Sequence, residues 1–267
     1  MLSKEKGFSL VELSIVLVVL GLLVGGVLTG RNLIRAAEIR SISADLNSYR
    51  IATYAFVDQY QALPGDLTNA VRYWGAAAGG TADGVDAACA ALTHTSPAIG
   101  TETCNGNGNG QIAASYEMMR FWQHLSNAGL ITGKYTGVTA NSAWSDRAHT
   151  PGINCPASKF KPGGFGIYYQ GYTDGLLWFF TGTYGNMFIF GGGPAGYEPY
   201  VGILTPEEAW NVDMKLDDGK PGTGAVRPRN INASGHLNCS TSSDPAVSTY
   251  NLSYTPAACG LYFITGL

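Results

Sequence analysis

The most constraining feature of this chain is an unbroken apolar segment close to its N-terminus. Residues 8–28 read FSLVELSIVLVVLGLLVGGVL and contain a single charged side chain, Glu12. As an α-helix rising about 1.5 Å per residue, this segment can cross a bilayer core of about 30 Å. A cleaved secretory signal would need a shorter apolar region followed by a small-residue cleavage site, whereas this run continues into Thr29, Gly30 and Arg31. The sequence therefore predicts a membrane-spanning helix over residues 8–28.

Glu12 is unusual because it places a carboxylate inside that apolar segment. On insertion scales, a charged side chain in a membrane helix costs at least about 2.5–3.5 kcal/mol, and it therefore needs water or a partner. Two interpretations follow from this cost. Glu12 reaches the water at the membrane interface, or it pairs with a positive group supplied by another chain.

The residues around Glu12 favour pairing with another chain. Residues 4–13, KEKGFSLVEL, resemble the class III signal of type IV pilins and type II secretion pseudopilins. The shared features are a short basic leader, the Gly7–Phe8 junction, a glutamate at the fifth position after that junction, and the apolar run. The resemblance covers about the first sixty residues.

The resemblance implies a specific processing and assembly route. A prepilin peptidase would cleave after Gly7 and methylate the new N-terminus at Phe8. Glu12 of one subunit would then neutralise the Phe8 amine of a neighbour, because an α-amine is largely protonated at neutral pH. An unpaired Glu12 would be penalised in the low dielectric of a membrane or filament core.

Beyond the apolar run, residues 31–60 continue as an amphipathic helix. Apolar side chains recur there at steps of three and four residues, namely Leu33, Ile34, Ile42, Leu46, Tyr49, Phe56 and Tyr60. The segment Leu63–Asp66, which contains Pro64 and Gly65, predicts the end of this helix. A helix over residues 8–60 would be about 80 Å long and would match the extended spine of the pilin family. Gly21, Gly25, Gly26 and Gly30 fit either local unwinding on assembly or close helix pairing.

The rest of the chain, residues 61–267, has the composition of a glycine-rich head. The whole chain contains 36 glycines and only 13% charged residues. Helices are expected over 67–74, 115–128 and 205–216, and strands over 165–170, 176–182, 186–190 and 261–265. The sequence therefore predicts an α+β fold, in which a long N-terminal helical spine carries a mainly antiparallel β head. The expected organisation is a leader over 1–7, a spine helix over 8–60 and a head over 61–267.

The sequence contains no motif of a known catalytic centre. It lacks GxSxG, HExxH and a phosphate-binding GK[ST] loop, and its four histidines are scattered. Asp213, Asp217 and Asp218 fit a helix end and turn better than acid–base chemistry, with a cation contact as the alternative. A net charge of −3 gives no electrostatic reason to expect a specific nucleic-acid partner. We therefore expect a protein that is not an enzyme.

One loop resembles a calcium-binding sequence. Asn105, Asn107 and Asn109 place oxygen side chains at positions 1, 3 and 5 of an EF-hand-like opening, and Gln111 stands at position 7. The loop departs from that pattern because its three acids are replaced by asparagine, and because Glu117 falls one place late for the bidentate ligand. A series of Asn–Gly turns explains the same residues. Calcium is the only cofactor that the sequence suggests.

The five cysteines allow more than one pattern of disulfides in an oxidising compartment. Cys239 and Cys259 resemble the pair that bounds the C-terminal loop of type IV pilins. Cys89 and Cys104 form the second expected pair, which leaves Cys155 free. In the rival arrangement, Cys155 pairs with Cys104 or Cys89.

These features predict a structural subunit that polymerises into a type IV pilus-like filament. The alternatives are a pseudopilin or minor pilin of a type II secretion or DNA-uptake system and, less favoured, a membrane-anchored ligand-binding module. The resemblance implies three partners: prepilin peptidase, the inner-membrane assembly machinery and further copies of this chain. It also implies that the precursor lies in the cytoplasmic membrane before it joins an extracellular filament.

Overall fold

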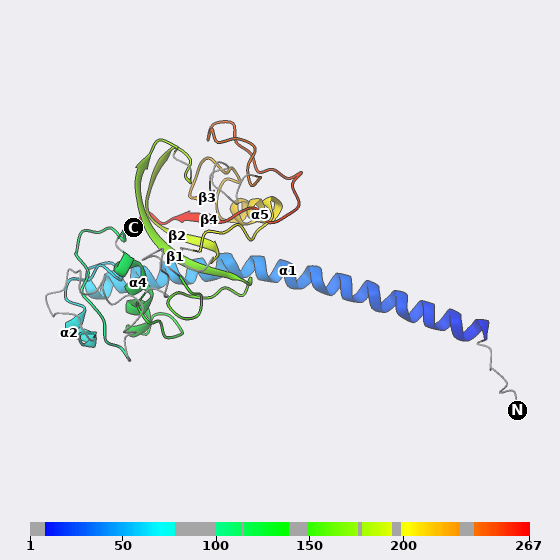
Figure 1. Cartoon of the computed structure of the whole chain (residues 1–267), viewed down its shortest axis with the longest axis horizontal. Helices are drawn as coiled ribbons and strands as arrows, with labels where there is room; N and C mark the ends of the chain where they lie inside the picture. Colours follow the sequence, from blue (N-terminus) through cyan, green and yellow to red (C-terminus); the bar gives the residue numbers. More distant parts are fainter. Residues whose placement is uncertain are drawn as a thin grey trace, which may run out of the picture.

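One long helix dominates the structure. The computed structural model describes residues 9–77, 100–113, 115–138, 149–175, 178–193, 199–229 and 238–267. Helix α1 spans Leu10–Tyr60, 51 residues, and is therefore about 77 Å long. Its first half projects away from the head, and its second half packs against the head (Figure 1). Among the described residues, α1 is the one helix long and apolar enough to cross a membrane, judged by length and composition.

Helix α1 ends where the sequence predicts, just before Leu63–Asp66. Gln61 adopts the left-handed conformation with φ of 56°, and its N–H donates to the Val57 carbonyl at 2.8 Å. A short helix, α2, follows at Val71–Trp74 within the expected segment 67–74. Gly65 lies in the turn between them with φ of +84°, and an added Cβ would collide with the Glu117 backbone carbonyl. This turn therefore requires glycine both for its backbone angle and for the close approach of the backbone at Glu117.

The head contains an antiparallel sheet, which confirms the predicted α+β fold class. Four strands of the described residues form it in the order β1-β2-β4-β3. Their bounds are β1 Gly163–Thr173, β2 Gly182–Gly192, β3 Val226–Pro228 and β4 Leu261–Ile264. The expected strands 165–170, 186–190 and 261–265 coincide with β1, β2 and β4. The observed ends of these strands differ from the expected ends by no more than a few residues.

The strand expected over residues 176–182 is wrong. Residues 178–181 belong to the connection between β1 and β2, and only Gly182 enters a strand. The two strands pair as a hairpin, with Thr173 opposite Gly182, so the chain must reverse in this segment despite its aromatic side chains. The three-residue strand β3 was not predicted, because its pairing to β4 depends on contacts distant in sequence.

Two further helices pack with the sheet. Helix α4 spans Ser115–Asn127 and helix α5 spans Pro206–Leu216, close to the expected 115–128 and 205–216. The main core joins α1, α4 and the sheet through aromatic contacts. Trp122 of α4 lies 5.1 Å from Tyr49 of α1 and 5.8 Å from Phe188 of β2, measured between ring centroids. These contacts fix the second half of α1 to the head.

The cysteines occupy three kinds of position. Cys239 and Cys259 form a disulfide that spans twenty residues. Closing a loop of this size is worth about 3 kcal/mol in the chain-entropy account. Cys104 is also disulfide-bonded, and its expected partner, Cys89, lies outside the described residues. Cys155 is free and buried, and burial raises the pKa of its thiol.

Candidate functional site

The first half of α1 is an apolar surface without cover from the head. None of the most apolar 18-residue stretch of this helix is buried within the chain. Its exposed large side chains are Leu10, Val11, Leu13, Ile15, Val16, Leu17, Val18, Val19, Leu20, Leu22, Leu23, Val24, Val27 and Leu28. An apolar surface of this extent is covered by lipid or by other protein in a stable state.

Glu12 lies at the start of this helix and takes part in its N-terminal cap. Ser9 is the N-cap: its backbone N–H donates to Glu12 Oε2 at 2.8 Å, and its hydroxyl accepts from the Val11 N–H at 3.3 Å. This capping box was not predicted, although the spacing Ser9-x-x-Glu12 is its usual signal in a sequence. Gly7 and Phe8, the predicted processing residues, lie outside the described residues.

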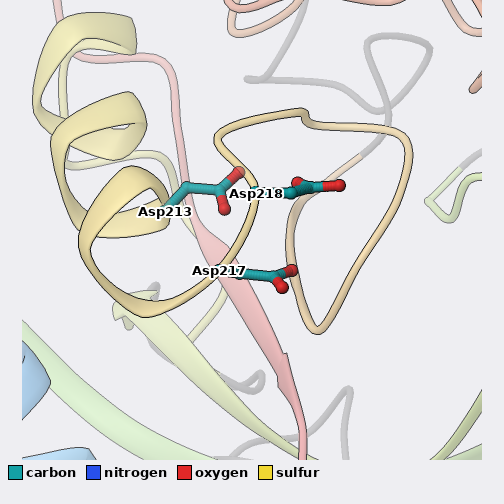
Figure 2. A group of neighbouring side chains, drawn as sticks. All are labelled: Asp213, Asp217 and Asp218. Atoms are coloured by element: carbon teal, nitrogen blue, oxygen red, sulfur yellow. The ribbon is translucent and has the colours of Figure 1, made fainter.

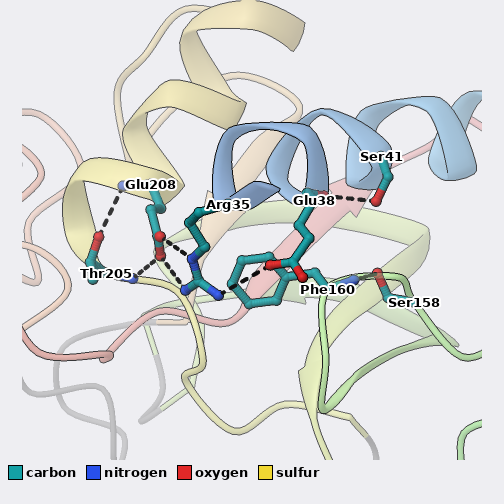
Figure 3. Close-up of polar contacts among 7 residues, drawn as sticks. All are labelled: Arg35, Glu38, Ser41, Ser158, Phe160, Thr205 and Glu208. Atoms are coloured by element: carbon teal, nitrogen blue, oxygen red, sulfur yellow. Dashed lines mark hydrogen bonds and ion pairs between the residues drawn. The ribbon is translucent and has the colours of Figure 1, made fainter. Parts of the chain in front are cut away.

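Arg35 joins the spine to the head where α1 begins to contact it. The Arg35 guanidinium donates from Nε and Nη2 to the two carboxylate oxygens of Glu208, at 2.6 and 3.0 Å. Its Cζ lies 3.8 Å from the centroid of the Phe160 ring, and its Nη1 lies 3.8 Å from Glu38 Oε2 (Figure 3). The guanidinium therefore contacts α1, α5 and the segment before β1 at the same time.

Glu208 is held in place by its own helix. Thr205 is the N-cap of α5, its N–H donates to Glu208 Oε2 at 2.9 Å, and the Glu208 N–H donates back to the Thr205 hydroxyl at 3.2 Å. The Glu208 carboxylate, which takes part in the capping box of α5, is thus also the group that accepts the hydrogen bonds of the Arg35 guanidinium (Figure 3). This shared carboxylate sets the position of α5 along the spine.

Removing the Arg35 side chain is expected to loosen this junction. Arg35→Ala should lower the free energy of unfolding by about 1–2 kcal/mol, because a bidentate pair and a cation–π contact are lost together. The Arg35 side chain is 40% exposed, so solvent screening keeps this effect below that of a buried pair. Thermal unfolding of the full chain in detergent measures the change. The matched control is Arg40→Ala, since Arg40 is an exposed cation on the same helix. Equal melting temperatures for the two variants would contradict the proposed role of Arg35.

Three aspartates gather at the end of α5. Asp213 comes from the helix and Asp217 and Asp218 from the loop after it, with carboxylate oxygens within 4.8 Å of one another (Figure 2). Hydrogen-bond donors of the chain already contact each carboxylate. The Asp213 carboxylate accepts hydrogen bonds from Tyr250 Oη at 2.8 Å and from the Gly219 N–H. The Asp217 carboxylate accepts from the Ala225 and Val226 N–H groups. The Asp218 carboxylate accepts from the Lys220 N–H and the Thr223 hydroxyl. The geometry is that of a helix end and turn, although three carboxylates of this kind are also able to hold a cation.

Asp213 should make the stability of the head depend on pH. Burial, together with the nearby carboxylates of Asp217 and Asp218, raises the pKa of Asp213 to about 7, although the hydrogen bonds from Tyr250 and Gly219 oppose the shift. The folded state therefore holds a proton that the unfolded chain releases near pH 4. The stability from this group is complete below about pH 4 and is lost as the pH rises to about 7, by up to about 1.4 kcal/mol per pH unit.

The test of this prediction compares the pH dependence of two variants. Asp213→Asn cannot titrate, so its melting temperature should fall less than that of the wild type between pH 4 and 7. Asp174→Asn is the control because Asp174 is exposed in the hairpin connection. Parallel pH profiles for the wild type and Asp213→Asn would contradict the prediction.

The Asn–Gly loop turns its backbone N–H groups toward a buried carboxylate. Asp66 Oδ1 accepts from the Gly108 and Asn109 N–H groups at 2.5 and 3.2 Å, and Asp66 Oδ2 accepts from the Gly110 N–H at 2.8 Å. The side chain of Asn107 accepts from the Asn109 N–H at 2.9 Å, as expected for an Asn–Gly turn. The groups that point into the loop are therefore backbone N–H donors, and they surround the Asp66 carboxylate.

The other predicted calcium ligands also accept hydrogen bonds from the chain or lie beside the loop. Asn105 Oδ1 accepts from the Val71 N–H, and Glu117 Oε1 accepts from the Asn107 N–H at 3.2 Å. The Gln111 N–H donates to Asn109 Oδ1. Calcium binding by these residues stays a prediction. A calcium-dependent rise in melting temperature that Asn107→Ala removes would support it, since binding to the folded state alone is stabilising.

A buried polar cluster around His124 of α4 was not predicted from the sequence. His124 Nδ1 accepts from the Gly65 N–H at 2.9 Å, and its Nε2 lies 2.9 Å from the Thr103 hydroxyl, which donates to Gln123 Oε1. Burial, with the nearby Arg120 cation, lowers the pKa of His124 to about 3, so the ring is neutral. This neutral ring links α4 to the turn at the end of the spine. The residues of this cluster form no sequence motif, because they come together only in the folded chain.

The comparison with known families identifies the N-terminal segment. Residues 2–28 match the family model described as the prokaryotic N-terminal methylation motif. The match includes Gly7, Phe8 and Glu12, and it confirms a type IV pilin-like class III signal in this chain. No match to the chain was found among curated proteins or among solved structures. The motif supports a pilin-like or pseudopilin protein, and a motif of this type implies processing by prepilin peptidase in general.

Proposed function

We propose that this chain is a structural subunit that is cleaved after Gly7, methylated at Phe8 and assembled into a type IV pilus-like extracellular filament. The observation that carries the proposal is the continuity of the methylation motif with a 51-residue helix whose apolar half has no cover from its own head. A simple membrane tether needs the apolar helix but has no use for a processing motif around Gly7–Phe8.

The same apolar surface would serve in two environments. In the precursor, lipid would cover the first half of α1, since the helix is long enough to span a bilayer. In the filament, the corresponding helices of neighbouring copies would cover it. The Phe8 amine created by cleavage would balance the charge of Glu12 as both groups leave water. The inner-membrane assembly machinery would move the subunit between these environments.

A pseudopilin or minor pilin of a type II secretion or DNA-uptake system is the second candidate. The observation in its favour is the methylation motif itself, which belongs equally to pilin-like and pseudopilin chains. The two candidates share processing and helix packing and differ in the abundance of the chain in the filament.

Purified surface filaments provide the test. We expect mass spectrometry to identify this chain as their main protein, with an N-terminal peptide that begins at methylated Phe8. Filaments in which the chain is present at a few copies would favour a minor pilin. A processed chain that never leaves the cell envelope would favour a pseudopilin. A chain that retains residues 1–7 in assembled filaments would contradict both candidates.

A further inference from the structure

The three Asn–Gly dipeptides of the chain all lie in one loop, residues 105–110. Asn–Gly is the dipeptide most open to spontaneous deamidation because glycine places no side chain beside the reacting atoms. The glycine backbone nitrogen attacks the asparagine side-chain Cγ, its proton passes to the departing amide, and ammonia leaves as a cyclic imide forms. Water then opens the imide to aspartate or isoaspartate. Three such sites in six residues would make an accessible loop chemically short-lived.

The nitrogens that would start this reaction are all hydrogen-bonded in the structure. The Gly106 N–H donates to the Leu67 carbonyl at 2.9 Å. The Gly108 N–H donates to Asp66 Oδ1 at 2.5 Å, and the Gly110 N–H donates to Asp66 Oδ2 at 2.8 Å. One buried carboxylate thus holds two of the three nucleophiles.

A carboxylate is an especially effective acceptor at these two positions. Each nitrogen must break its hydrogen bond before it attacks, and a hydrogen bond to a charged group is stronger than one to a neutral group. The attack also requires the nitrogen to give up its proton, and the negative charge of Asp66 opposes the growth of negative charge beside it. Asp66 is 3% exposed, so water screens this effect little.

The asparagine side chains are restrained as well. Asn107 Oδ1 accepts from the Asn109 N–H at 2.9 Å, and Asn109 Oδ1 accepts from the Gln111 N–H at 2.8 Å. The far end of the loop is fixed by Asn186 of β2, whose Nδ2 donates to the Gly110 carbonyl and whose Oδ1 accepts from the Ile112 N–H, both at 2.9 Å. Both reacting partners at each site are therefore held by the fold.

The near end of the loop lies directly against the backbone around Asp66. A Cβ added to Gly106 would overlap the backbone of Gly65 and Asp66, and one added to Gly108 would meet the Thr68 methyl group at 2.5 Å. The glycines that make the sequence vulnerable are thus the residues that let the loop close around Asp66. The same glycines therefore favour deamidation in the sequence and allow the contacts that oppose it in the fold.

We propose that Asp66 protects Asn107 and Asn109 from deamidation by holding the Gly108 and Gly110 backbone nitrogens. Asn105 is protected independently, because the Gly106 N–H uses the Leu67 carbonyl. Deamidation at 107 or 109 would add a carboxylate beside Asp66, and repulsion between these charges would open the loop. The inference does not depend on filament assembly, although a subunit exposed outside the cell would benefit from it because no intracellular repair reaches it.

The test follows deamidation site by site in the purified full chain at neutral pH. After reduction, trypsin cleavage at Arg72 and Arg120 releases one peptide that contains all three sites, and fragment spectra assign each event. In Asp66→Asn, Asn107 and Asn109 should deamidate about tenfold faster than in the wild type, as expected when a hydrogen bond to a charged group is lost. Asn105 should keep its wild-type rate. Asp58→Asn is the matched control because Asp58 is an exposed aspartate near the end of α1.

Two outcomes would overturn the proposal. Unchanged rates in Asp66→Asn would show that the carboxylate is dispensable, and equal acceleration at all three asparagines would indicate general loss of structure. Hydrogen exchange on the wild-type protein tests the same idea without a variant that has to fold. The Gly108 and Gly110 amides should exchange far more slowly in the folded chain than in urea, and asparagine deamidation should accelerate in urea. Rapid exchange of both amides in the folded protein would exclude the proposed protection.

Discussion

Replacing Glu12 by alanine is expected to leave the protein in the membrane and to reduce filament yield to background. Alanine removes a carboxylate that costs at least about 2.5–3.5 kcal/mol in an apolar segment, so insertion should be unchanged or improved. Assembly should fail because the Phe8 amine of the incoming subunit would enter the filament core without a counter-charge, and an unpaired buried charge costs about 3–5 kcal/mol. Glu12→Gln should behave in the same way, since it keeps the shape of the side chain without its charge.

Membrane fractionation and filament yield measure the two halves of this prediction. They require cells without a wild-type copy of the chain. Ser14→Ala is the control, because Ser14 lies on the same exposed part of α1 and its hydroxyl donates only to the Val11 carbonyl of its own helix. Normal filament yield from Glu12→Ala would show that the pairing is not needed. Loss of the variant from the membrane would show that Glu12 acts in insertion instead.

Replacing Gly7 by leucine is expected to block cleavage completely. The uncut precursor should accumulate in the membrane, and filaments should be absent, because the amine that Glu12 requires is created only by cleavage. Immunoblotting separates the precursor from the mature chain, and mass spectrometry of the N-terminal peptide identifies its first residue. The control is Ser3→Leu, which adds the same side chain to the leader away from the junction. Filaments built from uncut Gly7→Leu chains would contradict this prediction and the proposed function.

Several features of this protein were predicted from short stretches of sequence. The apolar run, the class III signal and the spine helix are properties of neighbouring residues, and α1 accordingly begins and ends close to its expected bounds. The helix after Thr205 was also predictable, because Thr205, Pro206 and Glu208 carry a capping signal within four residues. A helix start, a helix end or a processing site depends on local backbone chemistry.

Other features could not be predicted without the folded structure. Residues 176–182 have the composition of a strand, whereas in the structure residues 178–181 belong to the connection between the paired strands β1 and β2. The short strand β3 was missed because it exists only through its pairing with β4. Strand formation depends on a partner elsewhere in the chain, so composition alone does not decide it.

Sequence patterns do not predict the contacts that polar and charged residues of the head make with residues distant in the chain. Arg35 meets Glu208 across 173 residues, and Asp66 meets Gly108 across 42. The sequence of the Asn–Gly loop predicted turns or a calcium site, and the tertiary structure placed a carboxylate at its centre. By itself the sequence determined the apolar run, the class III signal and the long helix, because each is encoded by neighbouring residues. Only the tertiary structure decided which distant charges meet, because burial and hydrogen bonding between remote segments exist only once the chain has folded.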